Sequence, residues 1–160
     1  MQDVPDDSPE GEKRVLLVAS SGGHWIQLCR ISSAFDQNDT LYATTFKVVE
    51  PPNGDREAIA IPDASRSDLL RFFPLVAKLV VIFLWFRPRV VVSTGAAPGL
   101  MAIIIGKAMG ATTIWLDSIA NSERLSRSGR IAGSYADLWL TQWEGLAKSN
   151  PDLQCFGRTV

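Results

Sequence analysis

One short stretch, Ser20-Ser21-Gly22-Gly23-His24, holds the residue types best suited to chemistry in this 160-residue chain, and His24 is its only histidine. Glycines let the backbone turn sharply and come close to a ligand. A helix that begins directly after them offers unpaired N–H groups to an anion, and Ser20 or Ser21 can cap that helix or bind the anion through its hydroxyl. The stretch predicts a loop that binds a phosphate or sugar phosphate. The alternative is a plain turn from strand to helix.

His24 favours a chemical role for this loop. A histidine in the first turn of a helix lies near the positive end of the helix dipole, which favours the neutral imidazole. A neutral imidazole that faces a crevice is suited to removing a proton from an attacking hydroxyl. Asp117, expected at the end of another strand, can orient that imidazole or take the proton itself, and the residues alone leave both roles open.

Strands and helices must position these residues. Apolar runs predict strands over 14–19, 40–46, 57–61, 89–93, 111–116 and 135–141. Apolar residues at helical spacing predict one helix directly after Gly23 and a second over 98–109, which Gly110 ends. This alternation favours an α/β fold, a Rossmann-like parallel sheet. Ligands of such sheets bind outside the carboxyl ends of the strands. The segments 20–24, 94–98 and 117–118 all fall there, which predicts one crevice.

Residues 69–86, LLRFFPLVAKLVVIFLWF, are the most hydrophobic segment. Arg71, Pro74 and Lys78 interrupt it, so a membrane-spanning helix is not expected. One interpretation is a helix clamped between the sheet and a neighbour. The other is a monotopic, membrane-associating helix over about 66–87, and the two can hold together. In the second, the bilayer interface would contact Phe72, Phe73, Phe83, Trp85 and Phe86, with Arg66, Arg71, Lys78, Arg87 and Arg89 near the headgroups.

Composition limits the remaining function classes. The length and 46% hydrophobic content fit a single domain over 14–160, after an acidic tail over 1–13 that we expect to be disordered. A net charge of -1 gives no general attraction to nucleic acid. Cys29 and Cys155 lack metal-ligand spacing, so no metal and no cofactor is expected, and the absence of a secretory signal favours the cytosol.

Two further segments carry a family resemblance: residues 93–100, STGAAPGL, and residues 117–146, DSIANSERLSRSGRIAGSYADLWLTQWEGL. Together with SSGGH they closely resemble the membrane-associated subunit of two-component glycosyltransferases, over about Arg14 to Leu146. One branch of that family is the eukaryotic subunit that recruits the enzyme adding the second GlcNAc to dolichol-diphosphate-GlcNAc. The other comprises bacterial exopolysaccharide and capsule proteins of glucuronosyltransferase type, to which this chain is more similar.

The resemblance implies the N-terminal, acceptor-side half of a split GT-B glycosyltransferase. A small Rossmann-like partner subunit would hold the UDP-sugar donor. The acceptor would be a polyprenyl-diphosphate-linked sugar, and the complex would act by inverting transfer at the cytoplasmic face of the plasma membrane, as a peripheral protein.

Residue roles follow from the resemblance by position. His24 is the expected general base with Asp117 assisting, and the acceptor or its phosphates would contact Ser21, Gly22, Gly23, Gly95, Ser118, Arg124 and Arg130. The LS-x-SG-R element contains Leu125, Ser126, Gly129 and Arg130, and the partner interface would contain Trp139, Gln142 and Trp143. The sequence departs from the eukaryotic subunit in its acidic tail in place of a hydrophobic anchor. It departs from the family pattern in Asp117 in place of a glutamate and in Asn121 where an arginine is expected.

Several alternatives stay open. Arg124, Arg127 and Arg130 are either a solvated helix face or ligands of the acceptor diphosphate. Trp139 and Trp143 fit the core or a subunit interface better than a platform on which a sugar stacks. The chain as a whole can also be a non-catalytic scaffold that recruits a catalytic partner, or an unrelated domain that binds a nucleotide through its glycine loop.

Overall fold

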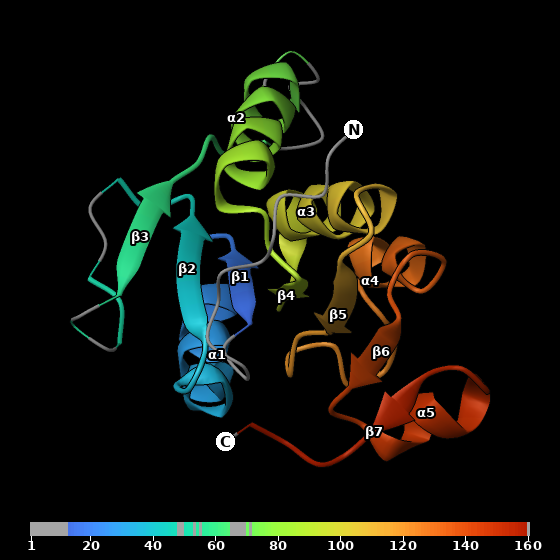
Figure 1. The fold of residues 1–160 in the computed structure, drawn as a ribbon. Helices are drawn as coiled ribbons and strands as arrows, with labels where there is room; N and C mark the ends of the chain where they lie inside the picture. Colours follow the sequence, from blue (N-terminus) through green and yellow to red (C-terminus); the bar gives the residue numbers. More distant parts are fainter. Residues whose placement is uncertain are drawn as a thin grey trace.

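The structure is a computed structural model that describes residues 13–47, 50–52, 54, 56–64, 70 and 72–159. Its strands are β1 (Arg14–Ala19), β2 (Asp39–Thr44), β3 (Glu57–Ala60), β4 (Val90–Ser93), β5 (Thr112–Leu116), β6 (Leu138–Thr141) and β7 (Gln154–Cys155). Its helices are α1 (Gly23–Ile31), the 3-10 turn η1 (Ser32–Phe35), α2 (Phe72–Phe86), α3 (Ala96–Ala108), α4 (Arg127–Ala132) and α5 (Glu144–Ser149). The strands form one parallel sheet in the order β3-β2-β1-β4-β5-β6-β7 (Figure 1).

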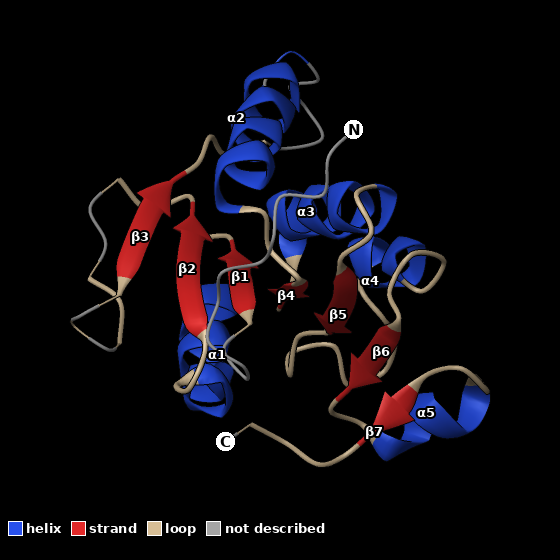
Figure 2. Cartoon of the chain, in the orientation of Figure 1, coloured by secondary structure: helices blue, strands red, loops and turns tan. Residues whose placement is uncertain are grey.

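Helices cover both faces of this sheet. Side chains of a strand alternate between faces, and along β1 Leu16 and Val18 face the side of α2 and α3, whereas Val15 and Leu17 face Leu28 of α1. Figure 2 shows α2 and α3 together at one end of the view and α1 apart from them, beside β1 and β2. The fold is therefore a three-layer α/β sandwich, as the alternation of strands and helices predicts.

The direction in which strands are added to the sheet reverses between β1 and β4. From β1 the chain builds outward through β2 to β3 and then returns to add β4 on the other side of β1. The register pairs Val18 with Ser93 and Ser93 with Trp115, so the carboxyl ends of β1, β4 and β5 lie next to one another. In open α/β sheets this switch point is where ligands bind.

The structure corrects some expected boundaries. The last expected strand, 135–141, begins only at Leu138, because the N–H groups of Tyr135 and Ala136 both donate to the carbonyl of Ala132 and continue the turn after α4. α4, α5 and β7 were not predicted. The stop at Gly110 is confirmed: its φ of 82° follows directly on the end of α3.

α2 has one buried and one exposed face. Leu75, Leu79, Ile82, Phe83 and Phe86 point into the core. The expectation that Phe83 and Phe86 contact a membrane is therefore wrong, because these side chains are only 1% and 9% exposed. Phe72 packs partly against the same core. Phe73 and Trp85, in contrast, are 75% and 61% exposed.

The boundaries of this segment also differ from expectation. The helix was expected over about 66–87, but α2 covers Phe72–Phe86, and the predictions for Arg66, Arg71 and the acidic tail up to residue 12 lie outside the described residues. Within the part of the chain that the structure describes, none of the helices has the length and apolar character to cross a bilayer.

Candidate functional site

Two hydrogen bonds join His24 and Thr94 at the switch point. His24 lies in the first turn of α1, and Thr94 follows β4. The Nδ1 atom of His24 lies 2.9 Å from the carbonyl oxygen of Thr94, and the hydroxyl of Thr94 donates to the carbonyl of His24 at 2.7 Å. A carbonyl can only accept, so Nδ1 carries the proton in this contact. The other ring nitrogen, Nε2, then holds the lone pair that a general base needs.

Gly95 makes this contact possible. Its φ is 141°, and a Cβ at this position would lie 2.3 Å from both Cε1 and Nδ1 of His24. The next residue, Ala96, also has a positive φ, of 65°. Two successive residues after β4 therefore have positive φ angles where the backbone passes next to the imidazole.

The loop before His24 is open to solvent. Gly22 (φ 85°) is the N-cap of α1, and no side chain caps this helix, so the expected cap by Ser20 or Ser21 is wrong. The N–H of Ser21 instead donates to the hydroxyl of Thr45. Ser21, Gly22 and Gly23 are exposed, and a Cβ at either glycine would meet no atom within 4 Å. A ligand can thus approach the backbone here, as the sequence predicts for a binding loop.

The carboxylate of Asp117 is fully engaged inside the protein. It accepts hydrogen bonds from the N–H and hydroxyl of Ser126, the side-chain amide of Asn121 and the indole N–H of Trp115, at 2.6–3.3 Å. Asp117 is 1% exposed. This geometry argues against the predicted transfer of a proton by Asp117, since both oxygens are occupied and shielded from an acceptor. It fits a structural role.

The LS-x-SG-R element has a clear physical basis in this network. Ser126 caps α4 by accepting from the N–H of Gly129, while its hydroxyl donates to Asp117. A Cβ on Gly129 would lie 2.4 Å from an oxygen of Asp117, so only glycine fits. Arg124 and Arg130 flank this anchored segment and are exposed, so a phosphate in solution can reach both guanidinium groups.

Two buried glutamines join the strand ends. The side-chain amides of Gln27 and Gln142 both donate to the main-chain carbonyl of Asp117, at 3.3 and 3.1 Å. Gln142 is 2% exposed, so the prediction that its side chain lies in a partner interface is wrong. The structural role of Gln27 was not predicted. The feature that could have indicated it is a polar residue on the apolar side of α1, one turn after His24. Ser118 accepts from the N–H of Ala120 and shapes the same turn.

The two tryptophans near the end of the chain differ in environment. Trp139 packs against the core, and its indole N–H donates to the carbonyl of Gly129. Trp143 donates to the carbonyl of Ile119, and the guanidinium of Arg158 lies 4.2 Å from its ring centroid. Both side chains are partly buried, Trp139 against the core and Trp143 beneath Arg158.

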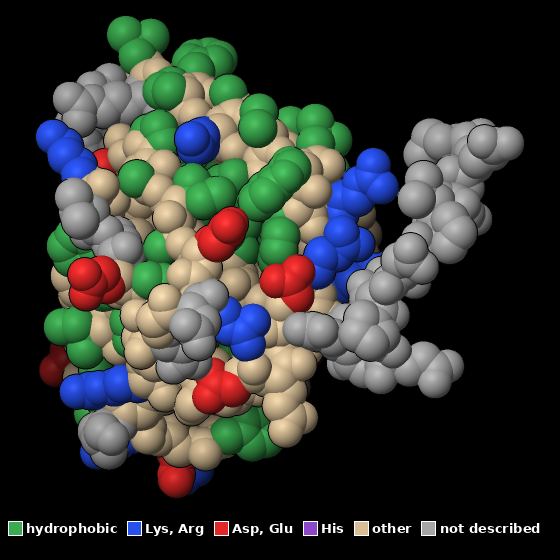
Figure 3. Space-filling view, turned by 60° about the vertical axis from the view of Figure 1, so that its left-hand side comes forward, with side chains coloured by type: hydrophobic (Ala, Val, Ile, Leu, Met, Phe, Trp, Pro, Cys, Tyr) green, Lys and Arg blue, Asp and Glu red, His purple; other side chains and the backbone are tan. Residues whose placement is uncertain are grey.

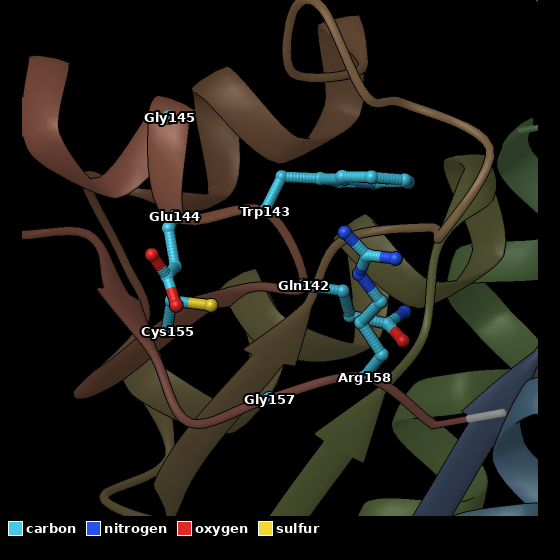
Figure 4. A pocket seen from close by; sticks show the side chains of 7 residues that line it. All are labelled: Gln142, Trp143, Glu144, Gly145, Cys155, Gly157 and Arg158. Atoms are coloured by element: carbon cyan, nitrogen blue, oxygen red, sulfur yellow. The ribbon is translucent and has the colours of Figure 1, made fainter.

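A cavity of about 310 Å³ lies beside Trp143, at the carboxyl ends of β6 and β7. Its lining residues are Gln142, Trp143, Glu144, Gly145, Cys155, Gly157 and Arg158 (Figure 4). In the close view Arg158 lies against Trp143, with Glu144 and Cys155 across from them. The lining of this cavity includes neither His24 nor Thr94 and Gly95.

The described residues offer little for metal or thiol chemistry. No group of three or more His, Cys, Asp or Glu residues within them is arranged to hold a metal ion. Cys29 and Cys155 are both free thiols, and burial raises the pKa of the Cys29 thiol above its ordinary value. His24 is therefore the most suitable proton acceptor at the described strand ends.

No protein-family model and no curated protein sequence matches this chain. Solved structures do resemble it. MurG from Acinetobacter baumannii is 9% identical with a TM-score of 0.62, over 82% of this chain and 41% of MurG. The UDP-GlcNAc 2-epimerase of Neisseria meningitidis, bound to UDP-GlcNAc, is 11% identical with a TM-score of 0.65, over 91% of this chain and 47% of that one. A glycosyltransferase from Rickettsia africae is 11% identical with a TM-score of 0.62, over 92% and 43%.

The likeness covers most of this chain but less than half of each matched structure. At these identities it shows the fold alone. The predicted fold class is confirmed: the chain has the Rossmann-like α/β fold of one half of a GT-B protein.

Proposed function

We propose that this chain is the acceptor-binding, membrane-associating subunit of a two-component glycosyltransferase. A UDP-sugar held mainly by a partner subunit is attacked by a hydroxyl of a polyprenyl-diphosphate-linked sugar. Nε2 of His24 accepts the hydroxyl proton while the new C–O bond forms at the anomeric carbon. UDP leaves from the opposite face with the electrons of the broken bond, so the configuration inverts.

The observation that carries this proposal is the environment of His24. The imidazole lies at the switch point, Nδ1 is fixed on the carbonyl of Thr94, and the adjoining Ser21–Gly23 loop is open. A base held in one orientation beside an exposed glycine loop suits deprotonation of a sugar hydroxyl. Asp117 takes no part in proton transfer in this proposal, and it fixes the loop that contains Arg124. Arg124 and Arg130 bind the acceptor diphosphate.

The exposed face of α2 supports the lipid part of the proposal. Phe73, Val81, Leu84 and Trp85 are each 60–75% exposed, and Lys78 lies among them. Figure 3 shows hydrophobic side chains crowded at the top of the molecule, the end where α2 lies in Figure 1. A row of large apolar side chains with a basic residue is typical of helices that lie in the bilayer interface. Such a face would bring the site to the cytoplasmic surface of the plasma membrane.

The partner subunit is proposed from the resemblance of residues 14–146 to the membrane-associated subunit of two-component glycosyltransferases. A donor-binding half on a second, small Rossmann-like subunit would complete a GT-B enzyme. The surface around Trp143 is the proposed contact, since its cavity adjoins strand ends other than those at His24.

The test is His24→Gln in the organism's own copy of the gene. Glutamine is uncharged and polar like the neutral imidazole, but its amide cannot accept a proton, so the variant removes the proposed base. Membranes are incubated with radiolabelled UDP-glucose, UDP-glucuronic acid, UDP-galactose or UDP-GlcNAc, and label in extracted lipid is counted. We expect transfer to fall ~10²- to 10⁴-fold, the usual contribution of a general base.

The control is Gln37→Ala, an exposed change near the amino end of β2, which should leave transfer unchanged. Full transfer in His24→Gln would exclude the catalytic role and favour the scaffold, in which this chain only recruits its partner. Saturable binding of UDP-sugar to this chain alone would favour the nucleotide-binding alternative.

A further inference from the structure

We infer that Thr94 and Gly95 are the positioning residues of the site, because they fix His24 in the tautomer that has its proton on Nδ1 and its lone pair on Nε2. The inference rests on the proposed function for its consequence. It can nevertheless be tested on the protein without any substrate.

Two reciprocal hydrogen bonds join the residues. The carbonyl of Thr94 accepts from Nδ1, which sets the ring, and the hydroxyl of Thr94 donates to the carbonyl of His24, which sets the backbone. Thr94 is 0% exposed, so water does not compete with its hydroxyl. The pair therefore fixes both the position and the protonation pattern of the imidazole.

Fixing the tautomer matters because the two nitrogens are not equivalent. In water an unconstrained histidine side chain prefers its proton on Nε2. With that tautomer the lone pair would sit on Nδ1, which here lies 2.9 Å from the oxygen of Thr94, and two lone pairs would repel. The carbonyl of Thr94 thus selects the tautomer whose free lone pair is on Nε2.

Gly95 supplies the space for this arrangement. A methyl group at this position would overlap Cε1 and Nδ1 of the ring, each at 2.3 Å, and would push the imidazole off the carbonyl. The N–H of Gly95 donates to the buried hydroxyl of Ser93 at 3.2 Å, so the backbone has little freedom to move aside. The collision must be relieved by the ring.

The experiment is a long-range ¹H–¹⁵N correlation spectrum of the whole, uniformly ¹⁵N-labelled protein at pH 8, where an ordinary imidazole is neutral. His24 is the only histidine, so its two ring nitrogens can be assigned without ambiguity. We expect a protonated Nδ1 and an unprotonated Nε2. A spectrum with the proton on Nε2 would overturn the inference.

The variant is Gly95→Ala, and its matched control is Gly110→Ala. Gly110 also has a positive φ, of 82°, but a Cβ there meets nothing within 4 Å, so the control shares the backbone strain without the collision. We expect Gly95→Ala to lose the Nδ1–H signature and Gly110→Ala to keep it. The wild-type tautomer in both variants would remove Gly95 from the role.

Thr94→Val provides a second route if Gly95→Ala does not fold. Valine keeps the shape but loses the hydroxyl that holds the backbone of His24, so we expect a mixture of tautomers, whereas Thr94→Ser should restore the single form. A single Nδ1–H form in Thr94→Val would show that the hydroxyl does not position the ring. These spectra do not depend on catalysis, so a failure of the proposed function would appear only in the transfer assay.

Discussion

At the scale of single residues, His24 and Asp117 follow β1 and β5 of one sheet, but their side chains differ in burial and in hydrogen bonding. His24 is half-buried, with one nitrogen bonded and the other free to act. The two oxygens of Asp117 accept from Ser126, Asn121 and Trp115 in the interior. The sequence placed both near the site, but only the three-dimensional network separates a candidate base from a structural carboxylate.

Replacement of Asp117 tests this distinction. In Asp117→Asn one oxygen becomes an NH₂ group, which would face the donors of Ser126 or Asn121 and leave at least one buried group unpaired. We expect the free energy of unfolding, measured in urea, to fall by ~1–3 kcal/mol. Glu123→Gln, an exposed change in the same loop, is the control and should alter it by less than about 0.5 kcal/mol.

The same variants decide the role of Asp117 in transfer. An Asp117→Asn protein of unchanged stability that loses transfer would contradict the structural assignment and return the residue to the chemistry. Loss of stability with transfer reduced only in proportion to the folded protein would support it.

At the scale of elements, α2 combines two roles that its sequence could not separate. The segment is apolar nearly all round, so periodicity alone does not say which side faces the core. The structure turns Leu79 and Phe83 inward and leaves Phe73, Leu84 and Trp85 in contact with solvent. An apolar outer face of this kind is expected to contact something, and the proposed function assigns it to lipid.

The double variant Leu84→Ser, Trp85→Ser tests that assignment in a flotation assay with vesicles of phosphatidylethanolamine and phosphatidylglycerol. Burying a large apolar side chain stabilises by ~1.5–3 kcal/mol, so removing two should weaken vesicle binding at least about tenfold. The matched control is Ile131→Ser, a change to an exposed apolar residue of α4, which should leave binding unchanged. Equal flotation of the double variant and wild type would refute a lipid contact at this face.

At the scale of the whole molecule, local signals predicted the sheet well and the loops poorly. The strands expected at 14–19 and 89–93 match β1 and β4 to within one residue, because a buried parallel strand needs a short β-rich apolar segment. α4 was missed because its six residues are mostly polar or small, and it forms through a cap by Ser126 that is itself held by Asp117. Such contacts between distant residues leave no periodic pattern in the sequence.

The remaining prediction concerns the proposed partner subunit. The proposed partner surface surrounds the cavity at Trp143 and includes Phe156, which is 79% exposed, and large aromatic side chains often dominate binding energy at interfaces. Tagged protein is recovered from membranes of its own source, and co-purifying proteins are quantified by mass spectrometry. We expect an equimolar small Rossmann-like subunit with the wild type, at least about tenfold less of it with Phe156→Asp, and no loss with Gln37→Ala. Equal recovery with Phe156→Asp would move the interface elsewhere, and recovery of the wild-type chain alone would argue against a two-component enzyme.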